Sequence, residues 1–243
     1  MSRRKATPQP ATPGSRDEDL APPRHGGDAE DAAFDSVYPP AIRAISRRFW
    51  TPVGVARRAA QLFRQAGARS VADIGSGAGK IVLVAAAAAP EVCFVGIEQR
   101  EHLVAAARRA QARLRVANAF FLVGEATKVP RLGFNGLYFF NPFAENLFVD
   151  GDQIDDAVEL TESRYFRDVL RIEHSLRAAP LGTAVVTYHG MSGRMPACYE
   201  LSEIERAGSD WLRLWVKKRE RAEGFFLELG DGVVLHRADG APA

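Results

Sequence analysis

The sequence predicts an α/β fold in which a doubly wound, mostly parallel sheet ends in an antiparallel hairpin at its C-terminal edge. Short continuous apolar runs alternate with segments whose apolar residues recur every three or four positions, the pattern of buried parallel strands separated by helices. Two β-like runs, at residues 211–216 and 224–229, then follow each other near the C-terminal end, as expected for a hairpin.

The first predicted element is a helix over residues 53–66, because Val55, Ala59, Leu62 and Phe63 share one helical face and Gly67 follows them. The next elements alternate between strand and helix and finish with two strands. In chain order they cover residues 71–74, 80–89, 92–97, 102–114, 120–123 and 137–140.

Beyond this region the spacing loosens, and residues 142–162 are predicted to be an irregular insertion near the site. Their aspartates lack the spacing of a calcium loop, so we expect no metal and a solvated loop. A helix follows, with apolar residues from Phe166 to Leu176 spaced by threes and fours. A strand at 184–188 precedes the hairpin, and residues 233–236 are a candidate extra strand.

Residues 1–37 are rich in proline, glycine, alanine and charge, which predicts a disordered N-terminal tail. One folded domain is expected over 38–237, followed by a disordered end at 238–243. The chain of 243 residues is 47% hydrophobic, which is enough to bury a full core.

The balance of 32 basic against 30 acidic side chains, a formal charge of +2, indicates neither nucleic acid nor an anionic membrane as a partner. Cys93 and Cys198 are expected to be free thiols. No run of about 18 apolar residues and no secretory signal is present, so we expect a cytoplasmic protein. The oligomeric state and the role of the tail are not predicted.

The stretch VADIGSGAGK, residues 71–80, carries three glycines on alternate positions directly before a helix. Such a turn lets a ligand approach the backbone at the positive end of a helix. A nicotinamide dinucleotide site needs its third glycine where Lys80 stands, and a phosphate loop needs Ser or Thr where Ile81 stands. The spacing therefore disfavours both of these ligands.

Acidic residues close the first two predicted strands. Asp73 stands near the end of the first, and Glu98 ends the second in VGIEQ. Parallel strands present their carboxyl ends at one edge of a sheet, so Glu98 is expected beside the glycine turn, where a carboxylate can bind two ribose hydroxyls. Asp73 is expected to face a cofactor's ammonium group.

Together, VADIGSGAGK and VGIEQ resemble the first two cofactor motifs of class I S-adenosylmethionine-dependent methyltransferases, and the resemblance in order of elements extends over about residues 50–237. It implies a Rossmann-like fold and S-adenosylmethionine as cofactor. The glycine loop also resembles that of nucleosomal-lysine methylases outside the SET fold. The cofactor-binding residues that the resemblance implies are Thr51, Asp73, Gly75, Ser76, Gly77, Gly79, Glu98, Gln99, Glu125 and Ala126.

The motif FFNPF resembles the catalytic loop of enzymes of this class that methylate nitrogen, without the second proline of the full pattern. It implies a catalytic role for Asn141, Pro142 and Phe143 in N-methylation of a protein lysine or a small-molecule amine. An oxygen acceptor would need a base, for which His189 is a candidate. The alternatives are an O-methyltransferase of a small metabolite, a non-catalytic module that binds the cofactor or RNA, and, less favoured, a nicotinamide oxidoreductase.

Overall fold

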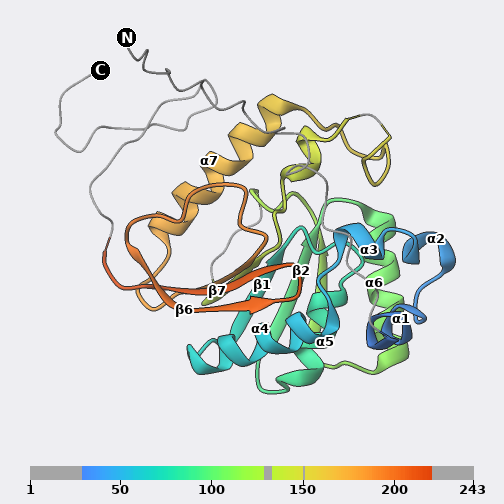
Figure 1. The fold of residues 1–243 in the computed structure, drawn as a ribbon, viewed down its shortest axis with the longest axis horizontal. Coiled ribbons are helices and arrows are strands. Elements are labelled where there is room, and N and C mark those ends of the chain that lie inside the picture. Colours follow the sequence, from blue (N-terminus) through green and yellow to red (C-terminus); the bar gives the residue numbers. More distant parts are fainter. Residues whose placement is uncertain (1–28, 129–132, 150, 221–243) are drawn as a thin grey trace, which may run out of the picture.

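The computed structural model describes residues 29–128, 133–149 and 151–220 (Figure 1). Their centre is a seven-stranded sheet in the order β3-β2-β1-β4-β5-β7-β6. Strands β1 to β5 are parallel, and β7 and β6 continue the sheet in antiparallel pairing. The strands are β1 (Ser70–Ile74), β2 (Cys93–Glu98), β3 (Ala119–Val123), β4 (Gly136–Phe139), β5 (Ala184–Tyr188), β6 (Tyr199–Ala207) and β7 (Asp210–Lys217). The predicted α/β fold with a mostly parallel sheet and an antiparallel edge is confirmed.

Helices cover both faces of the sheet, with α4 and α5 side by side on one face and α7 on the other (Figure 1). The helices are α1 (Ala29–Asp35), α2 (Pro40–Arg43), α3 (Ser46–Phe49), α4 (Val53–Gln65), α5 (Lys80–Ala88), α6 (Glu101–Leu114) and α7 (Glu162–Ala178), with a 3-10 turn η1 at Ala144–Leu147. No helix among the described residues is long and apolar enough to cross a membrane.

Alternation along the strands divides the apolar side chains between two cores. In β4, Tyr138 joins the core under α4, α5 and α6, whereas Leu137 and Phe139 join the core under α7. Strands β1, β4 and β5 are buried along almost their whole length, because both of their faces are covered. The result is a three-layer arrangement that holds the carboxyl ends of these strands in fixed positions.

The C-terminal hairpin differs from its prediction. Strand β7 matches the predicted run at 211–216, but its antiparallel partner is β6, which precedes it, and not the run at 224–229. Strand β6 has the sequence YELSEIERA, and a register shift between Leu201 and Glu203 breaks its alternation. The predicted strands at 224–229 and 233–236 lie outside the described residues.

The N-terminal boundary also differs, because residues 29–37 are part of the folded structure. Helix α1 is attached to α5 through Lys80, whose Nζ lies 2.6 Å from Asp31 Oδ1 and 2.7 Å from Asp35 Oδ1. The Ser46 hydroxyl also donates to Asp35, and only 3% of the Lys80 side chain is exposed. The prediction of a disordered tail up to residue 37 is therefore wrong for this segment, since a buried ammonium group orders it; residues 1–28 lie outside the described part.

Candidate active site

The glycine turn between β1 and α5 folds back onto the end of β2. The backbone N–H groups of Gly75 and Ser76 both donate to the Ile97 carbonyl oxygen, at 3.0 Å. Gly75 has φ +78° and Gly79, the residue before α5, has φ +82°, a region that favours glycine. The turn therefore lies at the carboxyl edge of the sheet, where open α/β sheets bind ligands.

The Glu98 carboxylate, 6% exposed, lies beside this turn as predicted. Its Oε2 accepts the Gly77 N–H at 3.0 Å, and its Oε1 accepts the Arg100 N–H at 2.9 Å. Burial raises the pKa of Glu98, and the two backbone donors and the Arg100 charge oppose that rise. The carboxylate is thus held in one orientation at the end of β2.

Asp73 is 4% exposed and lies opposite Gly96 of β2 and Tyr138 of β4 in the sheet register. Burial, and secondarily the Glu98 charge, raises the pKa of Asp73 well above its usual value. Within the described part of the chain, Asp73 Oδ2 is a buried atom without a hydrogen-bond partner. A carboxylate in this state favours a cationic ligand.

Two more buried polar atoms near the turn lack a partner among the described residues: Ser76 Oγ and Trp50 Nε1. The indole nitrogen lies 3.8 Å from the position that a Cβ on Gly77 would occupy, so it is next to the turn. Buried polar groups in proteins are nearly always hydrogen-bonded. One acceptor, one donor and one hydroxyl converge here, and together they suit the ammonium and carboxylate of an amino-acid group.

Thr51, a predicted ligand contact, is 3% exposed, and its hydroxyl lies 2.8 Å from the Tyr138 hydroxyl. Burial raises the pKa of Tyr138 well above its usual value, so this pair is a neutral hydrogen bond. Because Tyr138 is the sheet neighbour of Asp73, Thr51 and Tyr138 support the floor of the site. The hydroxyl of Thr51 is engaged with the protein.

The residues predicted to surround adenine lie near the N-terminal part of α7. The Gln99 side-chain oxygen accepts a hydrogen bond from Arg164. Glu125 forms an ion pair with Lys128, with Oε1 2.9 Å from Nζ, and the hydrogen bond from that lysine lowers the pKa of Glu125. Ala126 packs against the core under α7. These side chains follow β2 and β3, on the same side as Glu98.

The Asn141, Pro142 and Phe143 segment follows β4 and lies directly against the glycine turn. A Cβ on Gly75 would lie 3.3 Å from Pro142 Cβ and 3.9 Å from the Pro142 carbonyl oxygen. Asn141 has φ +41°, and its N–H donates to the Gly190 carbonyl at 3.0 Å. The predicted acceptor motif and the predicted cofactor motif therefore meet, although 66 positions separate Gly75 from Asn141 in the sequence.

Ser192 holds the acceptor motif from the other side, and sequence reasoning missed it. Its hydroxyl donates to Asn141 Oδ1 at 2.6 Å and accepts the Phe143 N–H at 3.3 Å. The Phe143 side chain is 7% exposed and belongs to the core under α7. No motif marks Ser192, because its role depends on a loop after β5 that approaches β4 only in the folded sheet.

His189 is engaged with the β6–β7 turn. Its Nε2 lies 2.9 Å from Ser209 Oγ, and its Nδ1 lies 3.1 Å from Asp210 Oδ2. Its ring packs edge-on against Phe140 and Tyr188. Both ring nitrogens thus contact the protein, an arrangement that joins the hairpin to the end of β5.

The expectation that the acidic insertion is a solvated loop is wrong for Asp155, whose side chain is 25% exposed, whereas that of Asp152 is 50% exposed. Asp152 Oδ1 lies 2.8 Å from Arg48 Nη1, and Asp155 Oδ1 lies 2.8 Å from Arg100 Nε. Both cysteines are free thiols, as expected. Among the described residues no group of three metal-ligating side chains gathers. The aspartates in this part of the insertion are partners for arginines.

The segment that contains the glycine turn and Glu98 is similar to a known protein family. Residues 67–136, which include β1, α5, β2, α6 and β3, match a family model described as "Putative methyltransferase". Over this segment the chain is therefore similar to methyltransferases. No curated protein matches the sequence. The predicted resemblance of this segment to methyltransferases is confirmed.

Solved structures of methyltransferases share the fold. A "putative O-methyltransferase" from Klebsiella pneumoniae superimposes with a TM-score of 0.51 at 15% identity, covering 83% of this chain and 94% of that one. The mitomycin 7-O-methyltransferase MmcR has a TM-score of 0.50 at 13% identity, with coverages of 72% and 56%. An RNA methyltransferase from Salinibacter ruber has a TM-score of 0.49 at 21% identity, with coverages of 70% and 94%.

Proposed function

We propose that this methyltransferase moves the methyl group of S-adenosylmethionine to a nitrogen atom of an acceptor that is a protein lysine or a small-molecule amine. The observation that carries the proposal is the contact between Pro142 and Gly75, which brings the acceptor motif against the cofactor turn. A methyl transferase needs this proximity, because nucleophile, methyl carbon and sulfur have to be held in line.

The cofactor site is proposed to run from Asp73 to Glu125 along the carboxyl edge of the sheet. Asp73 binds the ammonium group of the amino-acid part, next to the turn formed by Gly75, Ser76, Gly77 and Gly79. Glu98 binds the two ribose hydroxyls, which fits its buried carboxylate. Gln99, Glu125 and Ala126 surround the adenine, and Thr51 supports Asp73 through Tyr138.

The bound cofactor supplies a sulfonium leaving group, so the chain itself contributes mainly orientation, an effect that can supply about 7 to 11 kcal/mol. The Pro142 carbonyl and Asn141 Oδ1 accept hydrogen bonds from a neutral amine and direct its lone pair. Asn141 Oδ1 already accepts the Ser192 hydroxyl, and a carbonyl oxygen has a second lone pair for the acceptor. The Phe143 side chain packs in the core under α7 and so anchors the end of the motif.

The engagement of His189 favours nitrogen over oxygen as the acceptor atom. An oxygen acceptor needs a general base within hydrogen-bond reach. Both ring nitrogens of His189 contact Ser209 or Asp210, so this histidine is better suited to holding the hairpin. A neutral amine needs no base before methyl transfer, in agreement with the side chains around Asn141.

Titration calorimetry with S-adenosylmethionine and its demethylated product tests the cofactor, with NAD as a control ligand and Glu98→Ala as a control variant. We expect micromolar binding that the variant loses. Absence of heat with folded wild-type protein would refute the cofactor proposal.

Transfer of a labelled methyl group to a cell extract tests the acceptor. We expect the label on protein lysine or on an amine, with Asn141→Ala losing at least 100-fold in turnover while it binds the cofactor with wild-type affinity. Label in nuclease-sensitive or ester-linked product, or full turnover by Asn141→Ala, would overturn the assignment of nitrogen and of the Asn141 role.

A further inference from the structure

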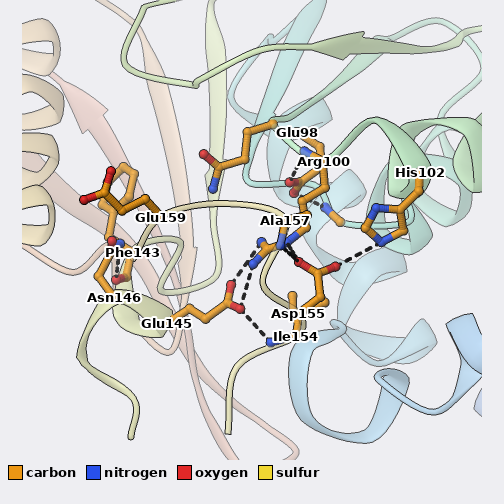
Figure 2. A network of polar contacts seen from close by, with 12 residues as sticks. Glu98, Arg100, His102, Phe143, Glu145, Asn146, Ile154, Asp155, Ala157 and Glu159 are labelled. Atoms are coloured by element: carbon orange, nitrogen blue, oxygen red, sulfur yellow. Dashed lines mark hydrogen bonds and ion pairs between the residues drawn. The ribbon is translucent and has the colours of Figure 1, made fainter. Parts of the chain in front are cut away.

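Arg100 stands at the start of α6, two residues after Glu98, and its side chain is only 3% exposed. Its guanidinium group uses three nitrogens on two carboxylates: Nη1 and Nη2 donate to Glu145 at 3.1 and 2.9 Å, and Nε donates to Asp155 at 2.8 Å (Figure 2). The bond to Glu145 is bidentate, the strongest arrangement for such a pair. No motif of the sequence identifies this residue.

The two carboxylates come from the loop that directly follows the Asn141 motif. Glu145 lies in η1, and its Oε1 also accepts the Ile154 N–H at 2.7 Å. Asp155 Oδ1 also accepts the Ala157 N–H at 3.0 Å, and Asp155 Oδ2 lies 3.1 Å from His102 Nε2. Figure 2 shows the guanidinium group between these side chains. Residues 144–149 and 151–157 therefore contribute two carboxylates to one guanidinium group.

The backbone of the same residue is bonded to the proposed ribose site, because the Arg100 N–H donates to Glu98 Oε1 at 2.9 Å. The side chain and the main chain of Arg100 thus connect the two sides of the active site. A buried arginine that loses its carboxylate partners is unfavourable, and so is a buried carboxylate that loses its arginine. The loop and Glu98 consequently cannot move independently while these bonds persist.

We propose that Arg100 is a positioning residue that couples cofactor binding at Glu98 to the order of the acceptor-side loop 144–157. A ligand that binds the Glu98 carboxylate fixes the backbone of Arg100, and the guanidinium group transmits this constraint to Glu145 and Asp155. The part of the loop that borders Asn141 is then held in the geometry required for the acceptor. This inference rests on the proposed function, since it assigns a role within the same site.

Hydrogen exchange of the peptide covering 144–157 tests the coupling, measured with and without saturating S-adenosylhomocysteine, whose affinity is measured in parallel by calorimetry. In the wild-type protein we expect the ligand to slow exchange of this peptide at least tenfold. Arg100→Met should bind the ligand about tenfold more weakly and, at saturation, slow exchange less than twofold. Arg100→Lys should recover part of the effect, because it restores the charge without the bidentate geometry.

Glu145→Gln provides a second test that preserves the size of the side chain, and it should also lose the ligand-dependent slowing. Arg108→Met is the matched control, because Arg108 lies in α6 and donates to the Phe121 carbonyl at 2.8 Å, a bond that does not involve the described residues of the loop. It should retain the wild-type response. Wild-type slowing in either Arg100→Met or Glu145→Gln at saturation would overturn the coupling, whereas absence of any binding to wild-type protein would overturn the proposed function itself.

Discussion

The Phe121 ring of β3 occupies the space that a side chain at Gly79 would need: a Cβ on Gly79 would lie 2.6 Å from Phe121 Cζ. Gly79 also has φ +82°. Gly79→Ala should therefore lower the free energy of unfolding by about 3 kcal/mol, combining left-handed strain with overpacking. Urea denaturation measures this loss.

Gly67→Ala is the control for Gly79→Ala. Gly67 has φ +74°, but a Cβ there would meet no atom within 4 Å. Gly67→Ala should lower the free energy of unfolding by about 1 kcal/mol, the cost of the left-handed backbone conformation alone. Equal losses in the two variants would mean that the Phe121 contact does not determine the requirement for glycine at position 79.

Trp50→Phe should separate stability from ligand binding. The change removes a buried N–H that has no partner among the described residues, but it also shortens a ring whose centroid lies 4.8 Å from that of Tyr38 in the core, so the free energy of unfolding should fall only by about 1 kcal/mol. Cofactor affinity should fall about tenfold, the effect of one lost hydrogen bond of about 1.4 kcal/mol. Calorimetry and urea denaturation measure the two effects, and Trp211→Phe on the exposed hairpin is the control. Unchanged affinity in Trp50→Phe would contradict a role in the site.

Asp73 should give the ligand-free protein a stability that decreases as pH rises. Because the pKa of Asp73 is raised in the folded state, the folded protein binds this proton more tightly than the unfolded chain does. The stabilisation is complete below the ordinary carboxyl pKa of about 3.9 and is lost as pH rises through the raised value. The free energy of unfolding of Asp73→Asn, relative to that of the wild-type protein, should therefore rise as pH increases above about 4, as urea denaturation at several pH values would measure. Parallel stability curves would exclude the buried, protonated state. Because the Glu98 charge contributes to the raised pKa of Asp73, the difference between the two curves belongs to this coupled pair.

Lys80→Met should lower the free energy of unfolding by about 3 kcal/mol, because it leaves Asp31 and Asp35 without their buried cation. It should also release α1, so that a protease cuts within residues 29–37 while the rest of the domain resists. Lys128→Met is the control, since Lys128 is 65% exposed and its pair with Glu125 should be worth well under 1 kcal/mol. Wild-type resistance of α1 in Lys80→Met would show that the ion cluster does not hold the helix.

Much of the fold could be predicted because it depends on local patterns. Continuous apolar runs marked β1, β2 and β5, and the paired motifs marked the turn and Glu98, whose places in the structure agree with the prediction. These signals need only the spacing of neighbouring residues.

The missed features depend on contacts between distant segments. Phe34 is the only large apolar residue of helix α1, and the helix is ordered by a lysine about 50 positions later. Strand β6 is polar and bulged, and its pairing with β7 defines it. Ser192 acquires its role only when the loops after β4 and β5 meet, and Arg100 acquires its role only when the loop after β4 meets the end of β2. Composition and periodicity contain no information on such encounters.

The burial of α5 determines which side of the active site can open. Its residues from Lys80 to Ala86 are all buried, and the turn before it follows β1, a strand paired on both sides. The glycine turn is therefore the immobile wall of the site, and a cofactor as large as a nucleoside has to arrive and depart past the opposite wall. The cofactor would then enter and leave past the segments around Trp50 and η1. Movement of these segments, and not of the glycines in the motif, should therefore determine the rate of product release.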